Sequence, residues 1–176
     1  MLAYARQQPG AEKVQWVEGD SSALGTPNAD LAIMTGNVAQ VFLNDTDWVA
    51  TLHHLHAALC PGGHLAFESR NPERKEWEGW NRDATYAQID SPSGPMECWL
   101  DLVSVADGRV HIVGHNVFTA TGEKMMVEST LRFRSQAELT ASLAGAGFMV
   151  EHLYGDWNHG PFTPESRLMI FVARRT

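Results

Sequence analysis

Apolar residues along the chain recur at helical spacing in one stretch and form short runs elsewhere. After several possible cap residues at positions 44–47, a stripe predicts one helix: Trp48, Leu52, Leu55 and Leu59. Pro61-Gly62-Gly63 must end this helix, because proline cannot continue the hydrogen-bond ladder and glycine adopts the left-handed cap. Leu65 and Phe67 begin the strand that follows.

Four further apolar runs predict strands, at residues 14–17, 31–34, 148–150 and 168–172. The run at 31–34 is continuous, which is typical of a strand buried on both faces of a parallel sheet. Two more segments predict helices. Residues 1–8 are helix formers stopped by Pro9-Gly10, and Ser135 with Glu138 forms a capping box ahead of Leu139 and Leu143.

Residues 98–134 alternate between apolar and polar positions and predict an antiparallel meander. Its three runs, 99–106, 109–120 and 125–134, are joined by Asp107-Gly108 and by residues 121–123. In the third run Val127, Leu131 and Phe133 alternate with Glu128, Arg132 and Arg134, so we expect one face of the meander to be wet. Strand–helix–strand repetition around this insertion predicts a single α/β domain over residues 1–176.

Composition narrows the function classes. The chain has 176 residues, of which 44% are hydrophobic, enough for one sizeable core. Its 13 basic and 21 acidic residues give a net charge of -8, which argues against nucleic acid or an anionic membrane as the partner. No apolar run approaches a membrane span, and no secretory signal opens the chain. Cys60 and Cys98 are typical of reduced thiols, so we expect a cytoplasmic protein.

Other catalytic classes find little support in the sequence. His53 and His56 could share a helix face, but no third ligand stands at a recognisable spacing, so we expect no metal site. The G-x-S-x-G elbow of a hydrolase and the phosphate-cradling loop of a nucleotide hydrolase are both absent.

The order of elements resembles that of class I S-adenosylmethionine-dependent methyltransferases. "VQWVEGD" resembles the family's third strand, which ends in an acidic residue that meets the adenine. "ADLAIMTGNVAQ" resembles the fourth strand and the loop beneath the methionine part of the cofactor. "LHHLHAALCPGGHLAFESR" resembles the helix, turn and fifth strand, and "LTASLAGAGFMVEHLYGD" with "RLMIFVARR" the closing helix, the sixth strand and the antiparallel seventh.

The resemblance implies a Rossmann-like sheet, S-adenosyl-L-methionine as the cofactor and a small-molecule methyl acceptor. Carried onto this sequence, it makes these residues candidates for cofactor binding: Asp20, Ser21, Met34, Thr35, Gly36 and Gln40. Asp20 could instead cap a helix or turn, and residues 35–37 could form only a tight turn.

The candidate substrate-binding residues lie at and after the end of the fifth strand and in the meander. Arg70 could anchor an acidic group of the acceptor, with Trp77 and Trp80 as an aromatic wall, or these tryptophans could simply cover the edge of the core. His115 is a candidate for substrate binding and for general base. The sequence does not single out a catalytic base among the other candidates: His111, Asn116, Tyr154, Asp156, Trp157 and His159.

One departure from the family concerns the main cofactor contacts. The family's glycine-rich turn after the first strand, and the acidic residue ending its second, would both lie upstream of Met1. We therefore expect a sheet truncated at its N-terminus, with little cofactor affinity. The bare edge of strand 31–34 would then be closed either by strand 14–17 or by a second copy in a homodimer, unless the meander is the dimer surface. The alternative function is a non-catalytic remnant that serves self-association or partner binding.

Overall fold

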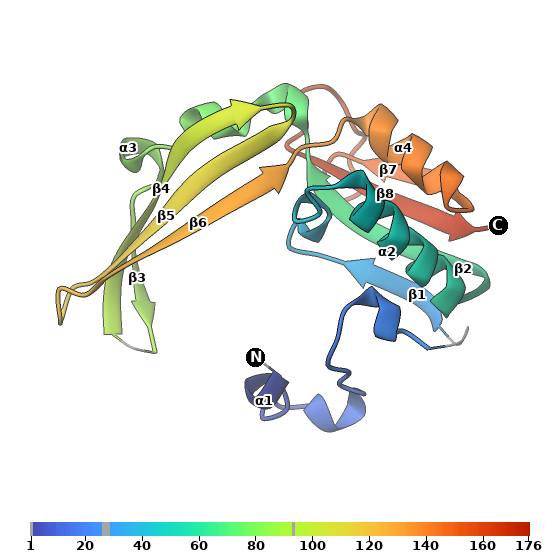
Figure 1. Ribbon diagram of the computed structural model, residues 1–176, viewed down its shortest axis with the longest axis horizontal. Coiled ribbons are helices and arrows are strands. Elements are labelled where there is room, and N and C mark those ends of the chain that lie inside the picture. The colour runs from blue at the N-terminus through green and yellow to red at the C-terminus, as the bar shows by residue number, and fades with distance from the viewer. Residues whose placement is uncertain (1, 26–28, 93) are drawn as a thin grey trace.

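The computed structural model describes residues 2–25, 29–92 and 94–176 and contains two separate four-stranded sheets (Figure 1). The first sheet has the strand order β1-β2-β8-β7. It consists of β1 (Ala29–Met34), β2 (Leu59–Arg70), β8 (Leu168–Arg175) and β7 (Phe148–Tyr154). β1 is parallel to β2, whereas β8 is antiparallel to both of its neighbours. The predicted strands at 31–34, 148–150 and 168–172 are confirmed, and so is the antiparallel last strand.

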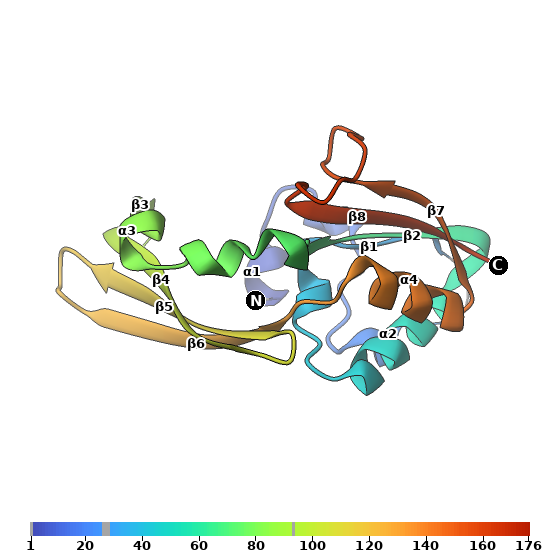
Figure 2. The same cartoon turned by 90° about the horizontal axis from the view of Figure 1, so that it is seen from above.

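Helices α2 (Asp45–Ala58) and α4 (Gln136–Gly145) cover the same face of this sheet (Figure 2). The predicted apolar stripe and the predicted capping box are both confirmed. Phe67 on β2 and Phe171 on β8 stack beneath the helices, with ring centroids 5.2 Å apart. The core is made of these and further buried side chains, including Trp48, Leu52, Leu65, Leu139 and Leu143.

The junction between α2 and β2 is tighter than the sequence predicts. The helix ends at Ala58 and β2 begins at Leu59, so Pro61 and Gly62 lie within an irregular start of the strand. The pairing register shifts there, and Gly62 has a φ of 80°. A Cβ on Gly63 would lie 3.0–3.2 Å from three backbone oxygens, so only glycine allows β1 to approach this closely.

The second sheet is the predicted meander, with one strand that the sequence analysis missed. Its order is β3 (Ala87–Ser91), β4 (Gly94–Ala106), β5 (Arg109–Phe118) and β6 (Lys124–Arg132). The Asp107-Gly108 turn is confirmed, with φ values of 50° and 69°. The short helices η4 (Pro72–Arg74), η5 (Glu76–Gly79) and α3 (Arg82–Thr85) connect the two sheets (Figure 1).

The predicted faces of the third meander run are wrong at two positions. Val127, expected on the packed face, is 48% exposed. Phe133 is buried as expected, but Arg134 is only 2% exposed and pairs with Asp45 at 2.9 Å. The reason is that β6 ends at Arg132, so the alternation of faces ends there as well. The sequence places Arg134 in a strand, whereas the structure places it against the start of α2.

Two expectations for the N-terminal part are also wrong. Residues 14–17 form no strand and do not pair with β1; they lie between the short helices η1 (Ala11–Lys13) and η2 (Ser21–Ala23). The run at 31–34 is not buried on both faces, because Leu31 and Ile33 are 58% and 65% exposed. β1 is an edge strand, and a backbone segment without a neighbouring strand has no ladder to join. Helix α1 is shorter than predicted, at Leu2–Ala5, and Met1 lies outside the described residues.

Candidate functional site

A cleft of about 590 Å³ lies between η2, the end of β1 and helix α2. Three of the predicted cofactor-binding residues line it: Asp20, Ser21 and Met34. It also includes Thr51 and His54 of α2. The remainder of its wall is largely apolar, so the polar groups are few and come from η2 and α2.

Asp20 acts as a cap in this structure. Its Oδ1 accepts hydrogen bonds from the backbone N–H of Ser22 at 2.8 Å and from the Ser22 hydroxyl at 2.6 Å. These bonds, side chain first, lower the pKa of the Asp20 carboxyl, so it is ionised at neutral pH. The capping interpretation is therefore confirmed. Because a carboxylate offers about four acceptor positions, the cap does not use up its capacity to bind a ligand.

Ser21 is tied to helix α2 by its hydroxyl. Its Oγ lies 3.0 Å from Nδ1 of His54 and 3.3 Å from Oγ1 of Thr51, to which it donates. Of the three histidines on α2, only His53 is exposed; His54 and His56 are partly buried. His56 packs edge-on against Phe148, and burial lowers its pKa.

The turn after β1 has the strained backbone that ligand-binding turns often have. Gly36 has a φ of 80°, and Asn37 adopts the left-handed conformation with a φ of 58°. The backbone N–H of Asn37 donates to Oε1 of the buried Glu68 on β2, at 2.6 Å. This carboxylate thus holds residues 35–37 over the end of β2. It carried no signal in the sequence, because a glutamate in an alternating strand normally faces water.

Gln40, in η3 (Val38–Gln40), is completely buried and contacts Arg70. Its Oε1 accepts a hydrogen bond from Nη1 of Arg70 at 3.1 Å, while its Nε2 has no partner among the described residues. In this arrangement Gln40 lies behind Arg70 and orients the guanidinium.

A second cleft, of about 460 Å³, lies beyond the turn and is lined by Asn37, Arg70, Glu76, Asp156 and Arg167. Glu76 forms ion pairs with two arginines: its carboxylate lies 2.5 Å from Nε of Arg167 and 3.9 Å from Nε of Arg70. Burial lowers the pKa of Arg70, yet an arginine stays protonated at any physiological pH. The second cleft therefore has fixed positive and negative groups on the same wall.

Trp77 and Trp80 both contact Phe133, but only Trp80 also contacts Arg70. Both pack on Phe133, Trp77 at 4.6 Å and Trp80 at 6.2 Å between ring centroids, so they cover a second small core under the meander. Trp80 also lies under the guanidinium of Arg70, 5.5 Å from the ring centroid. Trp80 is thus the one that supports Arg70 at the second cleft.

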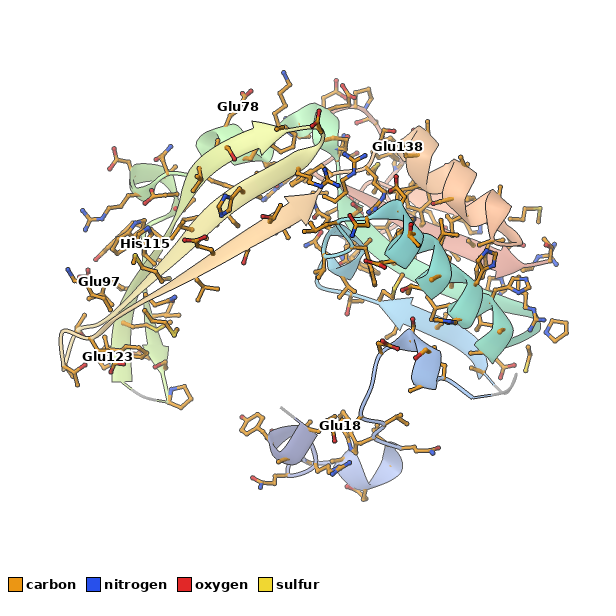
Figure 3. All side chains as sticks on the ribbon, in the orientation of Figure 1. Glu18, Glu78, Glu97, His115, Glu123 and Glu138 are labelled. Carbon is orange, nitrogen blue, oxygen red and sulfur yellow. The ribbon has the colours of Figure 1, made fainter. Side chains whose placement is uncertain are left out.

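His115 lies on the meander, away from both clefts (Figure 3). Its ring stacks on Trp99 at 4.7 Å, and its Nε2 lies 3.0 Å from Asp101. Thr35 and Gly36 stand on the turn between the clefts and line neither. The structure therefore brings Asp20, Ser21 and Met34 together, places Arg70 and Trp80 at the other cleft, and leaves His115 remote.

No helix in the part of the chain that the structure describes is long and apolar enough to cross a membrane. No group of three or more His, Cys, Asp or Glu side chains in residues 2–25, 29–92 and 94–176 could hold a metal ion.

Solved structures define the class of fold. A S-adenosylmethionine-dependent methyltransferase from Clostridium acetobutylicum is 11% identical; the match covers 99% of this chain and 70% of that one, with a TM-score of 0.80. CalS10, an amino pentose methyltransferase from Micromonospora echinaspora with bound S-adenosylmethionine, is 19% identical over 99% and 70%, with a TM-score of 0.68. KedS8, a sugar N-methyltransferase from Streptoalloteichus sp, is 14% identical over 99% and 74%, with a TM-score of 0.66.

This chain therefore has the Rossmann-like α/β fold of the S-adenosylmethionine-dependent methyltransferases, as predicted. The meander belongs to the region of similarity, since each match covers 99% of the chain. No model of a protein family matches the sequence, and a search of curated proteins gives no match either.

Proposed function

We propose that this chain is a S-adenosylmethionine-dependent methyltransferase that acts on a small molecule. The observation that carries the proposal is the turn at residues 35–37, which stands between two clefts. Met34 and Val38 line the first cleft and Asn37 lines the second. Two ligands bound on either side of one turn would have their reacting ends close together, which is what a transfer between them requires.

The first cleft would hold the adenosine part of the cofactor. Its volume of about 590 Å³ lies within the usual range for small-ligand sites, and its apolar walls carry a few polar groups, as such sites do. Asp20, Ser21 and Met34 would contact the nucleoside, and the backbone of residues 35–37 would face the methionine part. When bound, S-adenosylmethionine supplies an electrophilic methyl group on a sulfonium. The residues of this chain supply position and exclude water.

The second cleft would hold the methyl acceptor. CalS10 acts on an amino pentose and KedS8 on a sugar nitrogen, according to their names. We propose an acceptor of the same chemical class, a small polar molecule with an amine. Arg70 would bind an acidic or hydroxyl oxygen of it, because its guanidinium is held in place by Gln40 and Trp80.

Affinity for the cofactor should be low. Asp20 lies fully at the surface, and a hydrogen bond that competes with water contributes little. Ligand-observed NMR with S-adenosylhomocysteine tests the proposal, because this method detects weak binding. We expect saturation transfer at millimolar ligand, strongest on the adenine protons. Absence of transfer at that concentration would contradict the function, whereas micromolar affinity would contradict only the expected weakness.

Self-association is a second candidate, favoured by the exposed edge of β1. Leu31 and Ile33 point away from the core, and the outer edge of β1 pairs with no strand among the described residues. We propose that a second copy pairs along this edge. Light scattering should then show a dimer that Ile33→Lys converts to a monomer. The matched control is Val103→Lys, another exposed strand position, on the meander, which should leave the dimer intact.

A monomeric wild-type chain would refute the dimer. If Val103→Lys breaks the dimer and Ile33→Lys does not, the meander is the interface instead.

A further inference from the structure

His54 lines the first cleft, whereas the other two histidines of α2, His53 and His56, do not. The first cleft is lined by five residues of α2, spaced as i, i+3, i+4, i+7 and i+8: Asp47, Ala50, Thr51, His54 and Leu55. This spacing places them on one face of the helix. His53 is one position earlier and is exposed.

The hydrogen bonds of Ser21 favour one tautomer of His54. A serine hydroxyl has one hydrogen, and Ser21 donates it to Oγ1 of Thr51 at 3.3 Å. With that hydrogen assigned to Thr51, Nδ1–H of His54 is the donor in the 3.0 Å contact with Ser21 Oγ. In a neutral imidazole the other nitrogen is then an acceptor. Nε2 of His54 consequently presents a lone pair.

This lone pair has no protein partner. Across the described residues, 2–25, 29–92 and 94–176, nothing is hydrogen-bonded to Nε2 of His54. The other ionisable side chains that line the cleft are Asp20 and Asp47, both acceptors when ionised. Asp20 and His54 line the same cleft, and Ser21, the neighbour of Asp20, contacts the His54 ring directly.

We infer that His54 is a specificity residue that recognises the 6-amino group of the purine through Nε2. The inference rests on the proposed function and adds a residue that the sequence had given no role. A 6-amino group carries two hydrogens, so Asp20 and His54 can each accept one. A purine with oxygen at this position would place a carbonyl lone pair against the lone pair of Nε2, and the cleft should reject it.

The test compares S-adenosylhomocysteine with S-inosylhomocysteine, which has the 6-oxo group, by ligand-observed NMR on the full chain. We expect the wild type to prefer the adenosyl compound about 100-fold, because Asp20 and His54 each accept one hydrogen bond worth about tenfold. His54→Leu should reduce this preference to about tenfold, because leucine fills the space without an acceptor and Asp20 still accepts one hydrogen. His53→Leu, one residue away on the exposed face, is the matched control and should keep the full preference.

Two further variants guard against a merely structural effect. His54→Gln places an amide oxygen near the position of Nε2 and should keep part of the preference. Ser21→Ala frees the choice of ring tautomer and should weaken the preference without abolishing binding. The inference is overturned if His54→Leu discriminates as the wild type does, or if the wild type binds both compounds equally. Failure of the wild type to bind either compound would instead refute the proposed function.

Discussion

Replacing Arg134 by methionine should destabilise the link between the meander and the first sheet. Arg134 follows β6, and its guanidinium reaches the loop before α2. Nη2 donates to the carbonyl of Phe42 at 2.9 Å, and Nη1 to that of Ala39 at 3.3 Å. The same side chain pairs with Asp45 and lies over the ring of Trp48 at 5.5 Å.

The magnitude follows from the groups that the change leaves without partners. Two carbonyls of the loop lose charge-assisted bonds, and each such loss costs about 1–2 kcal/mol when the site is buried. Asp45 is 74% exposed on its side chain and returns to water, so its loss adds little. Methionine retains most of the packing volume. We therefore expect Arg134→Met to lower the free energy of unfolding by about 2–4 kcal/mol.

Urea unfolding measures this change as a shift of the midpoint at constant slope. Arg109→Met is a suitable control, because Arg109 is exposed and donates to the carbonyl of Leu43 in the same loop at 3.2 Å. The control should cost less than about 1 kcal/mol. Equal shifts for the two variants would show that burial of Arg134 does not determine its contribution.

Three other predictions concern stability. The hydrogen bond with His64 is the main cause that lowers the pKa of the Glu151 carboxyl from 4.5, so the stabilisation by ionised Glu151 is present at neutral pH and lost on acidification. The difference in unfolding free energy between wild type and Glu151→Gln should therefore shrink below pH 4.5, and a difference that stays constant in an acid titration would contradict this. Gly63→Ala should cost about 1–3 kcal/mol in urea unfolding because three backbone oxygens stand within 3.0–3.2 Å, while Gly79→Ala, with open space, should be near neutral. Phe67→Ala should lower stability by about 3–5 kcal/mol in the same assay, and a loss below about 1 kcal/mol would contradict its central place in the core.

Local patterns predicted the regular elements well. The stripe from Trp48 to Leu55, the capping box at Ser135 and the Asp107-Gly108 turn all appear in the structure. Each depends on interactions within a few residues of chain, so the local sequence suffices to encode it. The missed strand β3 pairs only with β4 along its full length, and its own sequence alternates weakly.

The candidate site could be predicted only in part. The sequence placed Asp20 and Ser21 near Met34 because each was expected to lie at the carboxyl end of a strand. The three residues do line one cleft, but residues 14–17 form no strand, and Ser21 is held there by its contacts with α2. Glu68 gave no such signal, because the Asn37 N–H that it binds lies about 30 positions away. Gln40 was a candidate for cofactor binding, but the sequence did not show that it would be buried against Arg70. His54 could have been found from its i+3, i+4 and i+7 spacing, had the cleft-facing side of α2 been known.

Periodicity, caps and turn residues encode most of the elements, their order and the apolar faces that pack together. Tertiary contacts set which charged groups are buried and which strand edges remain open. Arg134 and residues 14–17 illustrate this. Arg134 is buried against Asp45, 89 positions away, whereas residues 14–17 have no neighbouring strand with which to pair among the described residues. Burial and strand pairing depend on those partners, and no local pattern contains them.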